Sequence, residues 1–565
     1  MKQVAFSSTA GNSQRGDSQH GNSQHGNSHH GNSQYGRSND YENQEEEKQS
    51  SPMVFTPVDA PKHLVQSVVD TLKRPFAGVQ KLKETLFSVP HFAQLGEDFP
   101  NIEAKSTKGL IKLHTYFGEG WGIVLTHPKA FEPVTLTELS AAAGLLGEFD
   151  RRGCKVCAVG SNSLEMHLKW TCDLLVFDKE LGTKKVTGME HVFPIPIIAD
   201  PDRAIAHRLG ALDGTAEDPC GEPLLSRAVF IIGPDRKLRF SQLYPSTCGR
   251  SFREILRVLD ALQRTENRVI STPSGWVAGR PCLVNRDVNL QVKDVVFPQG
   301  VCAYRLVHMS LIATPDPQLE ERKLLHPLGA PKPSANPVSM LNLGDEFPNF
   351  AMDQHKLQLL NTYLGASWGI ICTLTDPFSP VCLTEMAHLL MKHTEQALIE
   401  KGCKLVIVAA KPIPVDFMED VLEYAQCGAM LSDWPFAVVV DESKEIIARL
   451  GALDEKIRDL DCMATVARAV FVVGPQLRLR ASLFYPSSVG RDCAEILRVI
   501  DSLRMTESNV VLFTPEGWHL GDECVADGSV DADLLQIYLP EHSTRNVVLK
   551  SGRRYFTYVK PQQQE

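Results

Sequence analysis

The sequence predicts an α/β protein built from two tandem copies of one domain, and two observations lead to this fold class. Short apolar runs that are typical of buried strands alternate with segments that are typical of helices, which favours a sheet with helices on its faces. The same motifs then occur a second time, in the same order, later in the 565 residues. A repeat of this length indicates a duplicated domain rather than a solenoid.

The alternation is clearest in the first copy. A helix is expected over 137–150, and strands are expected at Trp121–Leu125, Val156–Val159, Val192–Ile198 and Ala228–Ile232. In the second copy, the apolar run Trp368–Leu374 predicts a strand and the segment from Met386 predicts a helix.

The internal repeat consists of motif pairs that run through both copies. The pairs are Gly96–Ile102 with Gly344–Phe350, Trp121–Val124 with Trp368–Ile371, Phe131–Glu138 with Phe378–Glu385, Leu209–Asp213 with Leu450–Asp454, Arg227–Pro234 with Arg468–Pro475, Tyr244–Arg250 with Tyr485–Arg491, Glu254–Val258 with Glu495–Val499, and Thr272–Trp276 with Thr514–Trp518. The offset is 247 residues at the tryptophan pair (368 − 121) and 241 at the arginine pair (468 − 227). The second copy has therefore lost a net six residues between these points, as surface loops do.

The flanking segments complete the domain organisation. Residues 1–51 repeat Gly-Asn-Ser-Gln with interspersed histidines, and this composition favours a disordered, solvated tail over a metal site. Residues 52–91 are expected to form an amphipathic helical arm that packs on the body or on a partner. Prolines mark a stiff linker over 314–338, which separates the two predicted domains at 92–313 and 339–561.

Composition excludes several classes of protein. A net charge of −10 gives no reason to expect binding to nucleic acid, and the 14 cysteines are too sparse for a disulfide framework. No apolar run approaches the roughly 20 residues that a membrane-spanning helix needs. The first residues lack the apolar core of a signal peptide. A soluble protein in the reducing cytoplasm is therefore expected.

The candidate reactive group is Cys382, in the stretch Asp376–Glu385. It follows a predicted strand and lies where the next helix begins, so its thiol faces unpaired backbone N–H groups and the positive end of the helix dipole. Both features favour the thiolate, which is the reactive form. Ser379, three residues earlier, can bring a hydroxyl near the sulfur.

The segment Pro-Phe-Ser-Pro-Val-Cys-Leu-Thr-Glu resembles the active loop of peroxiredoxins, Pro-x-x-x-(Thr/Ser)-x-x-Cys, and the chain is most similar to the 1-Cys subfamily. The resemblance covers nearly all of 94–310 and 342–560, and includes the small C-terminal extension of that subfamily. It implies two thioredoxin-like domains and thiol-dependent reduction of a peroxide, without cofactor or metal. It also implies that Cys382 is the nucleophile, that Ser379 orients thiolate and peroxide, and that Arg468, Arg491 and Glu385 form the surrounding network.

The second copy departs from the family pattern at the start of this loop. The position of the usual proline, seven residues before the cysteine, is Thr375, and the position of the usual histidine is Leu374. This loop shields the thiolate in the family, so the change bears on rate and substrate preference.

The first copy lacks the reactive group. Thr135 stands at the cysteine position and Glu132 at the Thr/Ser position, while Arg227, Arg250 and Glu138 remain. A threonine hydroxyl is no nucleophile toward peroxide, so this domain is expected to be a pseudoenzyme.

Two further motifs are expected to have no catalytic role. Cys154-Lys-Val-Cys157 falls on a predicted buried strand, where side chains three apart face opposite sides. Some 1-Cys peroxiredoxins also carry a lipase-like Ser-His-Asp set. Neither copy holds it complete: the first has His114 and Asp235 but Gly120, and the second has Ser367 but Asn361 and Gln476.

Two hypotheses follow. The first is a thiol peroxidase that acts through Cys382 on hydrogen peroxide or organic hydroperoxides, with an unidentified thiol reductant. The second is a non-catalytic scaffold of two thioredoxin-like domains that docks to a larger assembly. Because a tandem chain holds both copies at high effective concentration, the two domains are expected to pack as an intramolecular pseudo-dimer, with further oligomerisation left open.

Overall fold

A computed structural model describes residues 92–180, 192–266, 269–286, 299–316, 341–352, 358–426, 436–458, 464–540 and 542–560, together with the single residues 288, 297 and 434. The low-complexity tail, the expected helical arm and most of the proline-rich segment lie outside the described residues. Within the described part of the chain, no helix is both long and apolar enough to cross a membrane.

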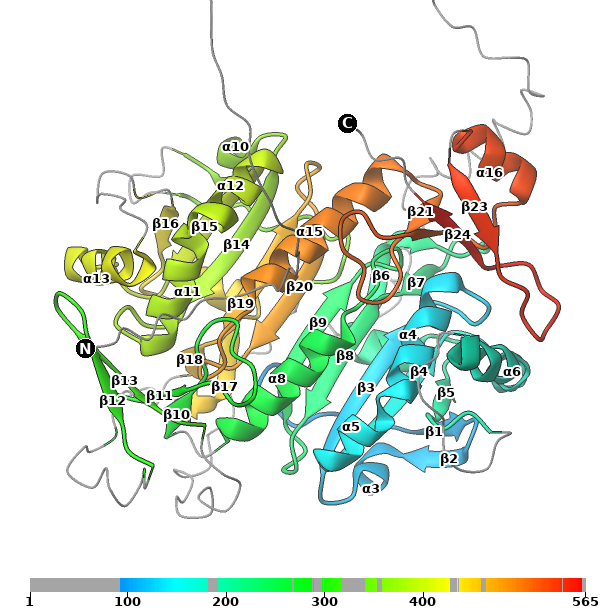
Figure 1. Ribbon diagram of the computed structural model, residues 1–565, viewed down its shortest axis with the longest axis horizontal. Coiled ribbons are helices and arrows are strands. Elements are labelled where there is room, and N and C mark those ends of the chain that lie inside the picture. The colour runs from blue at the N-terminus through cyan, green and yellow to red at the C-terminus, as the bar shows by residue number, and fades with distance from the viewer. Residues whose placement is uncertain are drawn as a thin grey trace, which may run out of the picture. The chain divides into compact units, whose positions relative to one another are not determined.

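The first domain is a sheet with helices on its faces, as predicted (Figure 1). Its main strands are β1 Glu103–Ser106, β2 Gly109–Lys112, β3 Trp121–His127, β4 Cys154–Gly160, β5 Ile197–Ala199, β8 Arg227–Ile232 and β9 Leu238–Tyr244, with the separate hairpin β6 Leu212–Glu217 and β7 Pro223–Leu225. Its helices are α3 Leu113–Phe117, α4 Pro133–Gly144, α5 Leu146–Arg151, α6 Leu164–Glu180, α7 Ala204–Arg208 and α8 Phe252–Arg264.

The second domain repeats this plan. Its main strands are β14 Trp368–Leu374, β15 Cys403–Ala409, β16 Ala437–Val440, β19 Arg468–Val473 and β20 Leu479–Tyr485, with the hairpin β17 Leu453–Arg458 and β18 Ala464–Val466. Its helices are α10 Leu360–Leu364, α11 Pro380–Leu390, α12 Lys392–Glu400, α13 Val415–Ala425, α14 Glu445–Arg449 and α15 Cys493–Ser508.

Two expected elements of the first domain differ from the structure. The helix expected over 137–150 begins earlier, at Pro133, and is divided into α4 and α5 at Leu145. The strand expected at Val192–Ile198 is limited to Ile197–Ala199. Pro194 and Pro196 explain the second difference, because proline has no N–H to donate to a neighbouring strand.

The two domains share one sheet of twelve strands. Its order is β16-β15-β14-β19-β20-β9-β8-β3-β4-β5-β1-β2, and the junction is the antiparallel pair β20–β9, in which Leu483 faces Gln242. Residues on the two faces of this sheet belong to two different hydrophobic clusters: Ile123 and Leu125 lie in one, and Val124 lies in the other. This alternation has the period of two that a strand imposes.

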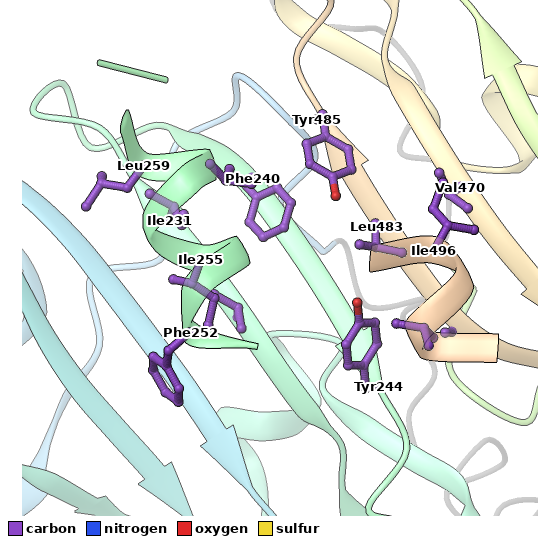
Figure 2. Packing of buried hydrophobic residues seen from close by; sticks show 14 of the residues in the cluster. Ile231, Phe240, Tyr244, Phe252, Ile255, Leu259, Val470, Leu483, Tyr485 and Ile496 are labelled. Atoms are coloured by element: carbon purple, nitrogen blue, oxygen red, sulfur yellow. The ribbon is translucent and has the colours of Figure 1, made fainter. Parts of the chain in front are cut away.

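One of these clusters runs across the junction. Figure 2 shows side chains of β8, β9 and α8 beside those of β19, β20 and α15. The rings of Phe240 and Tyr485 lie 4.9 Å apart between centroids. The two tyrosine hydroxyls cross between domains, since Tyr244 donates to Glu495 at 2.8 Å and Tyr485 donates to Glu254 at 3.1 Å.

Each domain ends in an extension that forms a small four-stranded sheet. The first extension, residues 269–314, holds β10 Ile270–Ser271, β11 Cys282–Val284, β12 Cys302–Arg305 and β13 Ser310–Thr314. The second extension, residues 511–560, holds β21 Leu512–Phe513, β22 Cys524–Ala526, β23 Ser543–Asn546, β24 Thr557–Lys560 and the helix α16 Ala532–Tyr538. Strand β13 reaches Thr314, the first residue of the range assigned to the linker.

The extensions are exchanged, so that each packs on the other domain. Ser274 of the first extension donates its N–H to Thr384 of α11 at 3.1 Å, and Glu516 of the second donates its N–H to Thr137 of α4 at 3.1 Å. The approach is close enough that a side chain at Gly249 or Gly490 would collide with the backbone of the opposite extension. This explains the glycine that both copies keep before Arg250 and Arg491.

Candidate active site

The central unit of the second domain is the strand β14, the loop 375–379 and the helix α11. Ser379 is the N-cap residue, and Pro380 supplies the first helical position, where its missing N–H costs nothing. Phe378, just before the cap, has a φ of 67°, a left-handed conformation that is strained for an aromatic residue. Cys382 therefore lies in the first turn of the helix, as predicted, and its side chain is fully buried.

Two polar groups contact the sulfur of Cys382. Arg468, the first residue of β19, donates from Nη1 to the sulfur at 3.2 Å. The hydroxyl of Thr375, directly after β14, lies 3.1 Å from the same sulfur. A guanidinium has no acceptor and carries a permanent charge, so the sulfur is the acceptor of this contact.

The arginine is held in turn by a buried carboxylate. Glu385, one helical turn after Cys382, accepts from Arg468 at 2.7 Å and from the Arg491 side chain at 2.8 and 3.0 Å. Burial alone would raise the pKa of the Glu385 carboxyl, but the charges and hydrogen bonds of the two arginines outweigh burial and hold the pKa below its ordinary value. Glu385 is therefore an anion that fixes both guanidinium groups.

This cluster holds one more buried cation than carboxylate among the described residues. Within the described residues, Arg468 and Arg491 form ion pairs with a single carboxylate, that of Glu385. Two buried cations with one anion leave an excess positive charge, which is costly inside a protein. A thiolate at Cys382 would supply the second negative charge, and it would do so at the atom that Arg468 already contacts.

The matching site of the first domain holds a second carboxylate instead. Glu132, the N-cap residue of α4, accepts from Arg227 at 2.7 Å and from the Thr135 hydroxyl at 2.5 Å. Arg227 also bonds Glu138 at 2.9 Å, and Glu138 bonds Arg250 at 2.7 Å. Two arginines thus meet two carboxylates, and the charge is neutral without any cysteine.

The residues predicted from the sequence come together, but the hydroxyl that contacts the sulfur is that of Thr375 and not that of Ser379. Cys382, Arg468, Arg491 and Glu385 form one connected cluster, as the preceding contacts show. Ser379 joins it through Arg468, whose Nη2 donates to the serine hydroxyl at 3.3 Å. The hydroxyl in contact with the sulfur belongs to Thr375. The sequence did signal this position, as a hydroxyl residue at the end of the strand where the family pattern has proline.

The two other motifs are engaged in packing. Cys154 and Cys157 are buried in different clusters on opposite faces of the sheet, and burial raises the pKa of the Cys157 thiol to about 12. His114 contacts the carbonyl of Phe99 at 2.8 Å, and Asp235 forms an ion pair with Arg239. A search of the described residues for three or more clustered His, Cys, Asp or Glu side chains that could hold a metal finds none.

Comparison with known proteins finds one family model that matches both domains, and relatives that each match about two fifths of the chain. The family model described as "AhpC/TSA family" matches residues 95–241 and 343–482. The Peroxiredoxin-6 proteins of Gallus gallus and Homo sapiens are each 42% identical to this chain over 207 residues, which is 37% of this chain and 89% of theirs. A crystal structure of a mutant of the Peroxiredoxin 6 of Arenicola marina is 41% identical, covers 40% of this chain and 98% of that one, and has a TM-score of 0.36.

These matches test the fold class that was predicted from the sequence. Two family matches in one chain confirm the predicted tandem duplication, and the predicted pair of thioredoxin-like domains is confirmed with it. The 1-Cys resemblance agrees with the Peroxiredoxin-6 relatives.

Proposed function

The chain belongs to the AhpC/TSA family, whose chemistry is thiol-dependent reduction of peroxides, and we propose that in this chain the second domain performs it through Cys382. The observation that carries the proposal is the contact between Arg468 and the Cys382 sulfur, within a cluster that holds one more buried cation than carboxylate among the described residues. A positively charged, hydrogen-bonded sulfur environment is what activates a cysteine.

The reaction needs no group beyond these side chains and a thiol reductant. The thiolate attacks the terminal oxygen of the peroxide, an S–O bond forms, the O–O bond breaks, and the departing alkoxide or hydroxide takes the proton that the thiol had lost. Cysteine is oxidised to sulfenic acid and the peroxide is reduced to an alcohol or water. Two reductant thiols then restore the cysteine, yielding one disulfide and one water.

Arg468 is suited to the transition state of this step. Its Nη2 donates to Thr375 and Ser379, and its Nη1 donates to the sulfur, so that the guanidinium spans the space around the reacting atom. Negative charge moves from sulfur to the departing oxygen during the attack. A buried cation that is already oriented stabilises this charge without reorganisation.

We propose that the first domain is a pseudoenzyme. Thr135 offers a hydroxyl instead of a thiol, and the Glu132 carboxylate takes the Arg227 guanidinium that a peroxide would need. A second anion at that place would also repel a thiolate.

The central experiment compares the two sites by substitution in the full chain. Cys382→Ser should abolish consumption of hydrogen peroxide in the presence of dithiothreitol, whereas Thr135→Ala should leave the rate unchanged. Mass spectrometry after one equivalent of peroxide should find the added oxygen on the peptide that contains Cys382. If Cys382→Ser consumes peroxide as fast as the unaltered chain, the proposal is wrong and a non-catalytic scaffold becomes the better account.

We further propose that the two domains act as an intramolecular pseudo-dimer. The β20–β9 junction, the tyrosine hydroxyls that bond across it and the exchanged extensions support this arrangement. After proteolysis between Asp316 and Leu341, the two fragments should elute together in size-exclusion chromatography without denaturant. Separation into two stable monomers would contradict the proposal. We place this chemistry in the cytoplasm, as the cysteine content predicts.

A further inference from the structure

We infer that Thr375 is a catalytic residue of the second domain, and that its hydroxyl donates a hydrogen bond to the Cys382 sulfur alongside Arg468. The inference rests on the proposed function of Cys382 and adds a residue that the family pattern does not contain. Its basis is a pair of distances: the Thr375 hydroxyl oxygen lies 3.1 Å from the sulfur and 3.2 Å from Nη2 of Arg468.

The direction of the bond follows from the partners of the hydroxyl. The guanidinium of Arg468 can only donate, so the Thr375 oxygen accepts from it. The hydroxyl hydrogen is then free to point to its other neighbour, the sulfur. A thiolate can only accept, so with an ionised cysteine the threonine must be the donor. Arg468 and Thr375 therefore form a short chain of donors that ends on the reacting atom.

Thr375 is also less buried than the two groups that it contacts. Cys382 and Arg468 are fully buried, whereas Thr375 is partly exposed and is followed by the exposed Asp376. The Thr375 hydroxyl can bond a peroxide oxygen during attack, and afterwards the oxygen left on the sulfur.

The first domain provides a natural contrast. At the offset of the tryptophan pair, the counterpart of Thr375 is Pro128 (375 − 247), the residue that the family pattern has at this place. Proline has no side-chain donor. The hydroxyl is therefore present in the domain with the cysteine and absent in the domain with Glu132.

The hydrogen bond has an expected effect on reactivity that depends on pH. A donor to a thiolate increases the fraction of ionised cysteine at neutral pH, but it also lowers the nucleophilicity of each thiolate. Loss of the donor should slow Cys382 where the thiol is mostly protonated and should not slow it where the thiol is fully ionised. A general disruption of the site would slow it at both values.

The test measures iodoacetamide alkylation of Cys382, followed by mass spectrometry of its peptide, in Thr375→Val, Thr375→Ala and Thr375→Ser. At a pH one unit below the midpoint of the unaltered chain's own alkylation curve, both the Val and the Ala variants should react roughly tenfold more slowly than the unaltered chain, as expected for one hydrogen bond to a charged group. At about pH 10 all rates should agree within a factor of about two, because the thiol is ionised throughout. Thr375→Ser, which keeps the hydroxyl, should match the unaltered chain at both values.

Thr544→Val, an exposed threonine of β23, is the matched control for the loss of a hydroxyl and should match the unaltered chain. Equal rates at this lower pH for Thr375→Val and the unaltered chain would overturn the inference, and so would a Ser variant as slow as Val. Slow alkylation at both pH values in Val and Ala would assign Thr375 a packing role and would overturn it as well. These readouts do not depend on turnover, so failure of the proposed peroxidase is recognised separately, by peroxide consumption in Cys382→Ser.

Discussion

The two strand–loop–helix units keep the same buried arginine pair and differ in the anion that faces it. In the first domain Arg227 and Arg250 meet two carboxylates, Glu132 and Glu138. In the second, Arg468 and Arg491 meet Glu385 and the sulfur of Cys382. The comparison teaches what differs within one shared frame: the position that faces the arginine at the start of the helix holds a carboxylate in the first domain and a cysteine sulfur in the second.

The contacts that hold each extension to the opposite domain differ as well. Asp173 of α6 accepts two hydrogen bonds from Ser551, at 2.6 and 2.7 Å, and one from Tyr555 at 3.1 Å, all from the second extension. Asp420, at the matching place of α13, accepts the N–H of His308 from the first extension at 2.8 Å, and its Oδ2 has no partner among the described residues. Among the described residues, Asp173 therefore accepts three hydrogen bonds from the extension that packs on its domain, whereas Asp420 accepts one.

The largest expected effect comes from exchanging the anion. In a Cys382→Ser background, the double change Glu132→Ser with Thr135→Cys should restore peroxide consumption to at least about a hundredfold above background, because the Arg227, Arg250 and Glu138 frame is intact. A coupled assay with dithiothreitol measures this gain.

The control for that exchange is Thr135→Cys with Glu132 retained. It should stay inactive, because the carboxylate keeps Arg227 and disfavours a second anion beside it. If the double variant folds and still consumes no peroxide, then a cysteine beside these two arginines and the glutamate is not sufficient for activity.

An intermediate effect is expected from neutralising the shared glutamate. Glu385→Gln leaves two buried arginines without a carboxylate and should lower the free energy of unfolding by about 3–5 kcal/mol. Glu138→Gln should cost less, since Arg227 keeps its ion pair with Glu132. Urea denaturation of both variants measures the difference, and a larger loss for Glu138→Gln would contradict the charge comparison.

The same pair of variants has a defined pH dependence. Arginine charges outweigh burial and hold the pKa of both Glu138 and Glu385 below the ordinary value. A depressed folded pKa stabilises the protein above the ordinary glutamate pKa, and this stability is lost as pH falls through the folded value. The gap between the unaltered chain and Glu385→Gln should therefore close below about pH 4.

The smallest expected effect concerns the stability of the two extensions. Amide hydrogen exchange should be roughly tenfold slower in β23–β24 than in β12–β13, because Asp173 provides about two more hydrogen bonds than Asp420. Asp173→Asn should remove most of this difference, whereas Asp420→Asn, which keeps a carbonyl oxygen for His308, should change little. Equal exchange in both hairpins before any substitution would contradict the comparison.

Much of this architecture could be predicted because it is local or repeated. The strand at Trp368 and the helix that carries Cys382 follow from periodicity and from Pro380 at the first helical position. The grouping of Arg468, Arg491 and Glu385 around the cysteine followed from the family resemblance, since residues so far apart in sequence meet only through the fold. Their hydrogen bonds lie within the second domain.

What escaped prediction depends on contacts between distant segments. In the sequence, Thr375 is visible only as a departure from the proline of the family pattern. The structure shows that its hydroxyl lies 3.1 Å from the Cys382 sulfur, a contact that the sequence does not indicate. The exchange of the extensions was equally hidden: nothing local to Ser274 indicates that it bonds Thr384 of the other domain. The sequence identified Glu132 only as the residue at the Thr/Ser position, whereas its carboxylate caps the helix and pairs with Arg227.

The junction of β9 and β20 has a consequence for how this protein can evolve. When two identical chains pair, every substitution appears twice, so a glutamate at the start of one active helix is forced upon the other. Here one chain encodes both sides of the junction, and each side can change alone. A glutamate that would inactivate both sites of a symmetrical dimer can therefore persist in one domain, where its carboxylate pairs with the buried arginine. The second domain keeps its cysteine, and the sequence of its loop can change without the same change occurring in the first domain.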